Sequence, residues 1–291
     1  MSSLIIAGAT GHGAWPSNTL PSAQRCFSAP VDGIEIDVQM TADGHVVAHH
    51  DYRLSRSQTR LNGEWITGSG PVLKDITLAE LRRYDIGRSR PGSGEARRHP
   101  DRAEMDGVPV PTLDELFEAL NATHGPRHYF YIEIKTDPLQ SDIASPPDVF
   151  TQAVIDQIEA HDYVAHAKII AFDWQVLRMT KARNPAIATA HLTVPNGMSG
   201  GVQTLGSGED SPWADGCDPR HHGGSDIAAI AAHGGMEWSP HYTDVTPERA
   251  HEAGRLGLRV GPWGLSKEED IERMQGLNVW SCTVAGPAWG R

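Results

Sequence analysis

The chain has 291 residues, 39% of them hydrophobic, and a formal net charge of -12 at pH 7. That charge argues against a nucleic-acid partner, because affinity for the phosphate backbone comes mainly from lysine and arginine. No run approaches the roughly 18 apolar residues that span a membrane. The first residues lack the basic region of a secretory signal, so we expect a cytoplasmic protein with one sizeable core.

The first predicted element is a strand from Leu4 to Ala7, followed by the glycine-rich segment GATGHGA at residues 8–14. Pro16 and Pro21 delay the next helix until about Thr19, because proline lacks the amide that a helix interior needs. A strand that leads into a glycine-rich loop is one way in which dinucleotide-binding domains begin. The loop is therefore a candidate binding site.

The second predicted strand runs from Gly33 to Gln39, and its apolar and polar residues alternate. Residues two apart share one face of a strand, so the carboxylates of Glu35 and Asp37 lie side by side, opposite the apolar residues. In a barrel this polar face points into the lumen, where an unpaired carboxylate is costly unless a cation or a donor meets it. An exposed edge strand with a polar face would show the same alternation.

The third predicted strand runs from His45 to His49 and leads into His50 and Asp51. Barrel enzymes keep their chemistry at the carboxyl ends of the strands, and a histidine there can exchange protons near neutral pH. A zinc site on His45 and His49 is an alternative, although the pair lacks the helical spacing of the familiar zinc motifs.

The stretch from about residue 52 to 111 is rich in glycine and proline, and we predict an insertion over one end of the barrel. In a capping box, a threonine or serine is followed three residues later by a glutamate. This pattern predicts helix starts at Thr77, Thr112 and Ser266. A second long loop, at residues 193–225, is rich in glycine and is predicted to be mobile.

The strand predicted from His128 to Lys135 repeats the alternation and places Glu133 and Lys135 on one face. Together with Glu35 and Asp37, Glu133 completes three carboxylates from two strand ends, which is the kind of oxygen set that Mg²⁺ or Ca²⁺ requires. Lys135 could hold a substrate phosphate as a point charge, or it could be the ion-pair partner of Glu133.

Four further strands are predicted, at Lys168 to Phe172, Ile187 to Leu192, Met236 to Ser239 and Arg259 to Trp263. Another helix is predicted to begin after Thr246, where Pro247 suits a first turn, and to end near Gly257. Eight strands with helices between most of them fit a (β/α)8 TIM barrel, which needs about 250 residues. We therefore predict the α/β class and a single barrel domain over residues 1–291.

Several segments of the chain resemble the glycerophosphodiester phosphodiesterases, in the family's order: VDGIEIDVQMTADGHVVAHHD, LKDITLAELRRYDIG, VPVPTLDELFEAL, YIEIK, IIAFDWQVLRMTKARNP and VTPERAHEAGRLGLRVGPW. The most specific elements are the E-x-D strand, the strand ending in His-Asp and the later E-x-K. The resemblance implies a barrel with an inserted cap and a bound Mg²⁺ or Ca²⁺. It also implies hydrolysis of a small phosphodiester substrate with a glycerol arm, as in lipid metabolism.

The resemblance also implies roles for individual residues. These are metal ligation by Glu35, Asp37 and Glu133, acid/base catalysis by His50, phosphate contact by Lys135 and substrate binding by Trp263.

The start of the chain departs from the family's pattern. The family's first strand ends in His-Arg-Gly, and Pro-Glu-Asn-Thr begins eight residues after the histidine. Here residues 16–19 are PSNT, so Gly8 and Ala9 stand in place of the histidine and arginine, and Ser17 stands in place of the glutamate. His12, in the same loop, is the candidate for the second catalytic histidine, and solvent is the alternative.

Two other functions remain open from the sequence. A nicotinamide-dependent short-chain dehydrogenase would use the glycine-rich loop and the Tyr131-x-x-x-Lys135 spacing, but the loop has no helix directly behind it and the pair lies in a strand-like run. A catalytically impaired barrel that binds a phosphorylated ligand would explain the missing histidine. The sequence predicts no oligomeric state.

Overall fold

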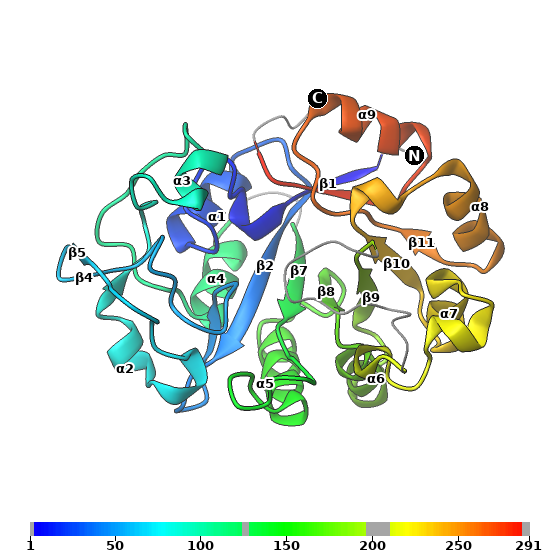
Figure 1. Ribbon diagram of the computed structural model, residues 1–291, viewed down its shortest axis with the longest axis horizontal. Coiled ribbons are helices and arrows are strands. Elements are labelled where there is room, and N and C mark those ends of the chain that lie inside the picture. The colour runs from blue at the N-terminus through cyan, green and yellow to red at the C-terminus, as the bar shows by residue number, and fades with distance from the viewer. Residues whose placement is uncertain (1–2, 124–127, 196–209, 287–291) are drawn as a thin grey trace.

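The protein is a nearly closed barrel of eight parallel strands surrounded by helices (Figure 1). The computed structural model describes residues 3–123, 128–195 and 210–286. The barrel strands are β1 (Leu4–Ala7), β2 (Gly33–Met40), β7 (Tyr129–Ile134), β8 (Ala167–Ala171), β9 (Ala188–Thr193), β10 (Glu237–Pro240), β11 (Arg259–Val260) and β12 (Ser281–Val284). They pair in the order β11-β10-β9-β8-β7-β2-β1-β12. The predicted α/β barrel is thereby confirmed.

The two ends of this sheet are joined by backbone hydrogen bonds. The amide of Trp280 donates to the Val260 carbonyl at 2.7 Å, and the amide of Thr283 donates to the Pro262 carbonyl at 2.9 Å. These bonds bring β12 alongside β11 and close the barrel.

One predicted barrel strand is wrong. The run from His45 to His49 forms β3 (Val46–Ala48), which pairs antiparallel with β2 outside the barrel order. Only a short turn separates β2 from β3, whereas a parallel neighbour needs a crossover of a dozen or more residues. The eighth barrel strand is β12 instead, because its chain segment has a helix before it and pairs parallel with β1.

The helices pack around the outside of the barrel. They are α1 (Leu20–Phe27), α4 (Leu113–Asn121), α5 (Pro147–Ala160), α6 (Trp174–Arg183), α7 (Asp226–Ala232), α8 (Pro247–Arg255) and α9 (Glu268–Gly276). The core lies between them and the strands, where Ile34, Ile36 and Val38 of β2 are completely buried.

The predicted helix starts are tested by the caps. Thr77 and Thr112 form complete capping boxes, and α8 begins after Thr246 and is followed by Gly257 in the left-handed region. The start predicted at Ser266 is wrong, because the residue before α9 is Lys267, whose side chain makes no capping bond. Three acidic residues in the first turn of α9 stabilise that end through the helix dipole instead.

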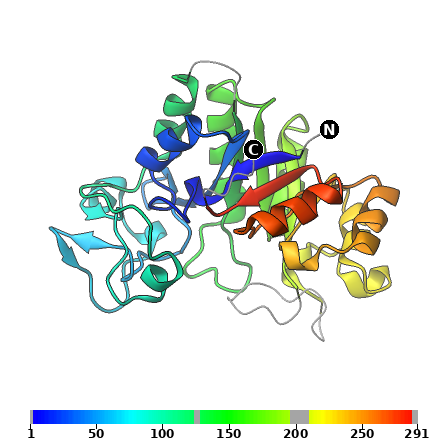
Figure 2. The same ribbon diagram turned by 90° about the horizontal axis from the view of Figure 1, so that it is seen from above.

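The chain between β3 and α4 forms a cap, which lies on the side of the barrel built by the first elements of the chain (Figure 2). It contains a small sheet of β4 (Arg60–Leu61), β5 (Glu64–Trp65) and β6 (Tyr84–Asp85), with α2 (Leu78–Leu81) and α3 (Gly94–Arg98). Apolar side chains that include Leu54, Leu73 and Leu81 pack together inside it, and Val47 of β3 joins them.

The second long loop contains residues 196–209, so the mobility predicted there lies outside the described residues. On its described side are the short helices η3 (Pro212–Ala214) and η4 (Pro219–His222). No described helix combines the length and the apolar character needed to cross a membrane.

Candidate active site

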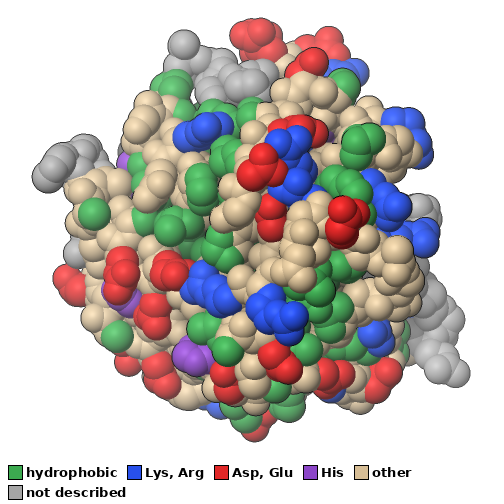
Figure 3. All heavy atoms as spheres, turned by 90° about the vertical axis from the view of Figure 1, so that its left-hand side faces the viewer, with side chains coloured by type: hydrophobic (Ala, Val, Ile, Leu, Met, Phe, Trp, Pro, Cys, Tyr) green, Lys and Arg blue, Asp and Glu red, His purple; other side chains and the backbone are tan. Residues whose placement is uncertain are grey.

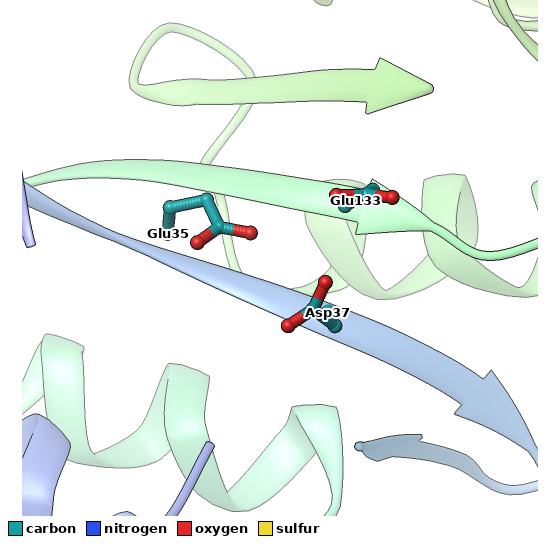
Figure 4. A group of neighbouring side chains, drawn as sticks. All are labelled: Glu35, Asp37 and Glu133. Atoms are coloured by element: carbon teal, nitrogen blue, oxygen red, sulfur yellow. The ribbon is translucent and has the colours of Figure 1, made fainter. Parts of the chain in front are cut away.

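Three carboxylates meet at one end of the barrel lumen. Glu35 and Asp37 lie on β2 and Glu133 on β7, and the parallel register pairs Asp37 directly with Glu133. One oxygen of each side chain lies within 4.8 Å of the others, and all three residues are buried (Figure 4). The predicted alternation of β2 thus places both of its carboxylates toward the lumen, opposite the apolar residues that face the helices.

Lys135 lies beside this cluster. Its Nζ is 2.8 Å from Oε1 of Glu133 and 3.2 Å from Oδ1 of Asp37. Burial opposes a charge on Lys135, but the two carboxylates outweigh it and raise the pKa of the ammonium. The structure therefore shows Lys135 as an ion-pair partner, the alternative that the sequence left beside phosphate binding.

The electrostatics of the three carboxylates differ. Burial, followed by repulsion from Asp37 and Glu133, raises the pKa of Glu35 well above its usual range. Burial also raises the pKa of Glu133. Burial acts in the same direction on Asp37, but Lys135, His50 and a hydrogen bond from Asn18 outweigh it and lower the pKa of Asp37.

Two neighbours from the N-terminal segment hold the carboxylates in place. Nδ2 of Asn18 donates to Oδ2 of Asp37 at 2.9 Å, and the Asp37 amide donates back to Oδ1 of Asn18 at 3.2 Å. The Ala9 amide donates to Oε2 of Glu35 at 2.7 Å. No sequence pattern predicts this role of Asn18, whose only signal is its place within the segment PSNT at residues 16–19.

The donor chemistry of the cluster fits a hard divalent cation. Three carboxylates and one ammonium leave an excess of two negative charges when all are ionised, in a place where water is largely excluded. Carboxylate oxygens are the ligands that Mg²⁺ and Ca²⁺ prefer. Neutralisation by a cation would remove the repulsion that raises the pKa of Glu35.

His50 lies at the mouth of the site with an exposed side chain. Its Nδ1 is 2.7 Å from Oδ1 of Asp51. Lys135 lowers the pKa of His50, but Asp37 and Asp51 raise it by more, so that the net shift is upward. The contact with Asp51 orients the ring and leaves Nε2 available, as in other His-carboxylate pairs.

A cavity of about 340 Å³ is lined by both His50 and Glu133, one of the three carboxylates of the cluster. Its polar lining includes His50, Glu133 and Lys135, and its apolar lining includes Phe172 and Trp213. A polar end and an apolar wall are typical of a small-molecule site.

The alternative zinc pair does not form a site. His45 is exposed and 3.9 Å from Asp43, and Nδ1 of His49 contacts the Asp51 carbonyl at 2.8 Å. Among the described residues, the one group of three or more side chains that could hold a metal ion is the carboxylate cluster.

The glycine-rich loop follows β1 at the same end of the barrel. A side chain added at Gly8 would have its Cβ 3.6 Å from Oε2 of Glu35 and 3.1 Å from Cγ2 of Thr283. Ala9 and Thr10 have φ values of 43° and 57°, in the left-handed region that side chains rarely adopt. The loop is thus sharply turned directly above the carboxylates.

His12 belongs to this loop and is partly buried. Its Nδ1 lies 3.0 Å from the Gly8 carbonyl oxygen, and its ring packs edge-on against His99 of the cap at 5.4 Å. A carbonyl oxygen only accepts, so Nδ1 carries the proton and Nε2 has the lone pair. Burial lowers the pKa of His12, which keeps the ring neutral, and Asp37 is close enough to act on it electrostatically.

Trp263 lies next to the cavity and not in its lining. Its ring packs edge-on against Phe172 at 5.9 Å and against His241 at 4.9 Å. Its indole Nε1 is buried and has no hydrogen-bond partner among the described residues. A buried, unpaired donor of this kind is unusual in a finished core.

The glycine-rich loop and the Tyr131-x-x-x-Lys135 spacing do not have the arrangement that a dinucleotide site requires. The loop contains the single 3-10 turn η1 (Gly8–Thr10), and the first α-helix, α1, begins only at Leu20, so no α-helix N-terminus stands directly behind the glycines. Tyr131 and Lys135 lie on or just after a strand, and the Tyr131 ring packs against Lys168, whose Nζ is 3.9 Å from the ring centroid.

The chain is similar to known proteins over nearly its whole length. A family model described as the glycerophosphoryl diester phosphodiesterase family matches residues 10–283. A glycerophosphodiester phosphodiesterase from Caldanaerobacter subterraneus is 29% identical over 275 residues, which are 94% of this chain and 90% of that protein. One from Bacillus subtilis is 24% identical and covers 93% of this chain and 79% of its own.

Solved structures agree on the fold. A crystal structure from Silicibacter pomeroyi, of a protein assigned as a glycerophosphoryl diester phosphodiesterase, is 29% identical with a TM-score of 0.83 and covers 99% of this chain and 92% of its own. An Oleispira antarctica phosphodiesterase, solved in complex with the product sn-glycerol-3-phosphate, is 18% identical with a TM-score of 0.67. It covers 99% of this chain and 94% of its own.

Proposed function

This chain belongs to the glycerophosphoryl diester phosphodiesterase family, and we propose that it hydrolyses glycerophosphodiesters with a divalent cation and a histidine acid/base. It is thus a phosphoric diester hydrolase. The observation that carries the mechanistic part is the buried cluster of Glu35, Asp37 and Glu133, which has more negative charge than Lys135 neutralises.

The three carboxylates would hold the cation, for which Mg²⁺ and Ca²⁺ are the candidates from the donor set. When bound, it supplies charge neutralisation for the phosphate oxygens as the reaction proceeds. Lys135 would contact the same phosphate, because it lines the cavity and its ammonium lies beside Glu133 and Asp37.

His50 would exchange the protons of the reaction. Hydrolysis forms a bond between a water oxygen and phosphorus and breaks the ester bond to the alcohol, which leaves with a proton. The Asp51 carboxylate holds Nδ1 of His50, so Nε2 would face the phosphodiester in the cavity. The upward shift in the pKa of His50 favours a ring that carries the proton to be donated.

His12 would take the opposite role, as a base. Its bond to the Gly8 carbonyl fixes the tautomer with a free lone pair on Nε2, and the lowered pKa keeps it neutral. Trp263 is the proposed substrate-binding residue on the apolar side, because its ring packs against Phe172, which lines the cavity, and its buried indole N–H has no acceptor among the described residues.

One observation favours a second candidate, a barrel that binds a phosphorylated ligand without turning it over. Gly8 presents no side chain to Glu35 at the end of β1. This candidate would be favoured if the protein bound sn-glycerol-3-phosphate but hydrolysed no glycerophosphodiester when Mg²⁺ or Ca²⁺ was supplied.

The test measures release of sn-glycerol-3-phosphate from sn-glycero-3-phosphoglycerol, after chelation and after Mg²⁺ or Ca²⁺ is returned. We expect chelation to abolish turnover and one of the two cations to restore it. The variant Glu35→Gln should neither bind the cation in calorimetry nor turn over. Full activity in chelator, or in Glu35→Gln, would contradict the metal-dependent mechanism.

A further inference from the structure

The cap carries a pocket that we propose to be an anion site for the alcohol side of the substrate. This inference rests on the proposed function and deepens it, because it names the substrate class. The pocket has a volume of about 480 Å³ and is lined by Asp51, Arg53, Leu54, Ser55, Arg56 and the segment 68–70. We call it the cap pocket.

The cap pocket adjoins the catalytic cavity. Asp51 and Arg53 line both of them, so the two spaces share a wall at the start of the cap. A phosphodiester held by Lys135 in the cavity can therefore extend its leaving alcohol past Arg53. A substituent at the far end of that alcohol would then lie between Arg53 and Arg56.

The two arginines of the cap pocket are not committed to carboxylates. Neither Arg53 nor Arg56 forms an ion pair with a described residue, and the nearest polar contact of Arg53 is Nη1 to the Gly70 carbonyl oxygen at 3.5 Å. Other arginines of the cap, among them those at 60, 88 and 102, are paired with carboxylates. Figure 3 shows basic side chains lying among acidic ones on the cap side of the molecule. In a chain with a net charge of -12, two unpaired arginines in one pocket favour an anionic ligand.

The backbone of the pocket is held in shape. Gly70 packs so tightly that an added Cβ would lie 2.0 Å from the Leu54 carbonyl oxygen. The Leu54 amide donates to the Pro71 carbonyl at 3.1 Å, which fixes the two walls against each other. Ser69 and Gly70 line the pocket, and their amides donate to no described residue.

One carboxylate also lines the cap pocket. Asp51 would repel an anion, but its Oδ1 is bound to Nδ1 of His50 at 2.7 Å, and Arg53 and Arg56 line the same pocket. The balance of the pocket therefore remains positive. Arginine binds phosphate and carboxylate with paired, parallel hydrogen bonds, so the group that fits is a phosphate or a carboxylate.

The inferred substrate is a glycerophosphodiester whose alcohol bears a second anionic group. A test compares KM for four substrates: sn-glycero-3-phosphoglycerol, its terminally phosphorylated form, sn-glycero-3-phosphoserine and sn-glycero-3-phosphocholine. We expect the phosphorylated substrate to have a KM about tenfold below that of sn-glycero-3-phosphoglycerol, since one charge-assisted contact contributes about this factor. A preference for the serine substrate instead would assign the pocket to a carboxylate.

The variant Arg56→Gln tests the pocket itself, because Arg56 does not line the catalytic cavity. In this variant the KM for sn-glycero-3-phosphoglycerol, divided by the KM for its terminally phosphorylated form, should fall about tenfold, to near one. Arg83 is an exposed arginine elsewhere on the cap that forms no ion pair with a described residue, so Arg83→Gln is the matched control and should leave the ratio unchanged.

Equal KM values for all four substrates, or an unchanged ratio in Arg56→Gln, would overturn the inference and leave the proposed function standing. If no glycerophosphodiester is hydrolysed, the proposed function fails instead. Calorimetry with inorganic phosphate then still decides about the pocket: weaker binding in Arg56→Gln than in Arg83→Gln supports it, and equal binding contradicts it.

Discussion

The candidate active site has two halves that are built in different ways. The strand half consists of Glu35, Asp37 and Glu133, whose positions follow from the register between β2 and β7. The loop half consists of residues 8–15, which turn through consecutive left-handed conformations and are tied to the cap by the bond from the Ala103 amide to the Ala14 carbonyl. A sheet fixes charges to within a fraction of an ångström, whereas a loop can be rebuilt around the same centre.

This difference suggests a division of labour. The strand half would hold the cation that neutralises the phosphate, and its three carboxylates cannot move without moving the sheet. The loop half would supply one proton-transfer group, and its departure from the family pattern at Gly8 and Ala9 leaves the strand half unchanged. Four substitutions test this division, from the strand half to the periphery.

The largest effect is expected from Asp37→Asn. Asp37 contacts both Lys135 and Asn18, and its charge is one of the three that would hold the cation. We expect kcat/KM to fall on the order of 10³-fold, as for other losses of preorganised charge in an active site. Steady-state kinetics at saturating Mg²⁺ or Ca²⁺ measure this, with the exposed Asp148→Asn as control. Retention of most activity in Asp37→Asn would remove the strand half from catalysis.

The next effect is expected from His12→Gln. Loss of a general base costs roughly 10²-fold or more in kcat, and cation binding in calorimetry should stay as in the wild type because the strand half is intact. Placing a histidine back at the end of β1, as Gly8→His with Thr283→Ser to relieve the contact of 3.1 Å, should recover part of the lost turnover. Unchanged turnover in His12→Gln would show that solvent, and not His12, serves as the base.

A smaller effect is expected from Asn18→Ala. Asn18 acts through Asp37, with two hydrogen bonds of 2.9 and 3.2 Å. Residues that orient a metal ligand contribute about 10-fold to 100-fold to metal affinity. We therefore expect the apparent activation constant for the cation to rise by about tenfold, while kcat at saturating cation is largely kept. A loss of kcat without a change in that constant would contradict the positioning role.

The smallest effect is expected from Trp263→Phe. The substitution keeps the aromatic contact with Phe172 and removes the buried indole N–H, which has no described partner. Loss of one neutral hydrogen bond to the substrate should raise KM about fivefold and leave kcat unchanged. An unchanged KM would mean that this donor does not reach the substrate.

The sequence predicted the strand half because its geometry is local. The alternation of β2 and β7 assigns Glu35, Asp37 and Glu133 to polar faces without any knowledge of the rest of the chain. That β2 pairs with β7 depends on contacts between residues nearly one hundred positions apart, which no local pattern encodes. Here the resemblance to a family supplied the missing long-range information.

The errors and omissions have local causes as well. The run at His45 to His49 has strand character, but the short turn before it forces an antiparallel pairing, so it became β3 outside the barrel order. Asn18 was missed because its role depends on a left-handed backbone, with φ at 55°, that presents both ends of its amide to Asp37. The contact between His12 and His99 joins a loop to the cap, and no motif spans the two.

The most direct test of the central claim is the position of a cation in crystals of the protein soaked with Mn²⁺, located by its anomalous scattering. We expect one strong peak within about 2.0–2.6 Å of an oxygen of each of Glu35, Asp37 and Glu133, with His12 and His50 on either side of the space above it. A peak bound elsewhere, or no peak at this cluster at a Mn²⁺ concentration that supports turnover, would contradict it.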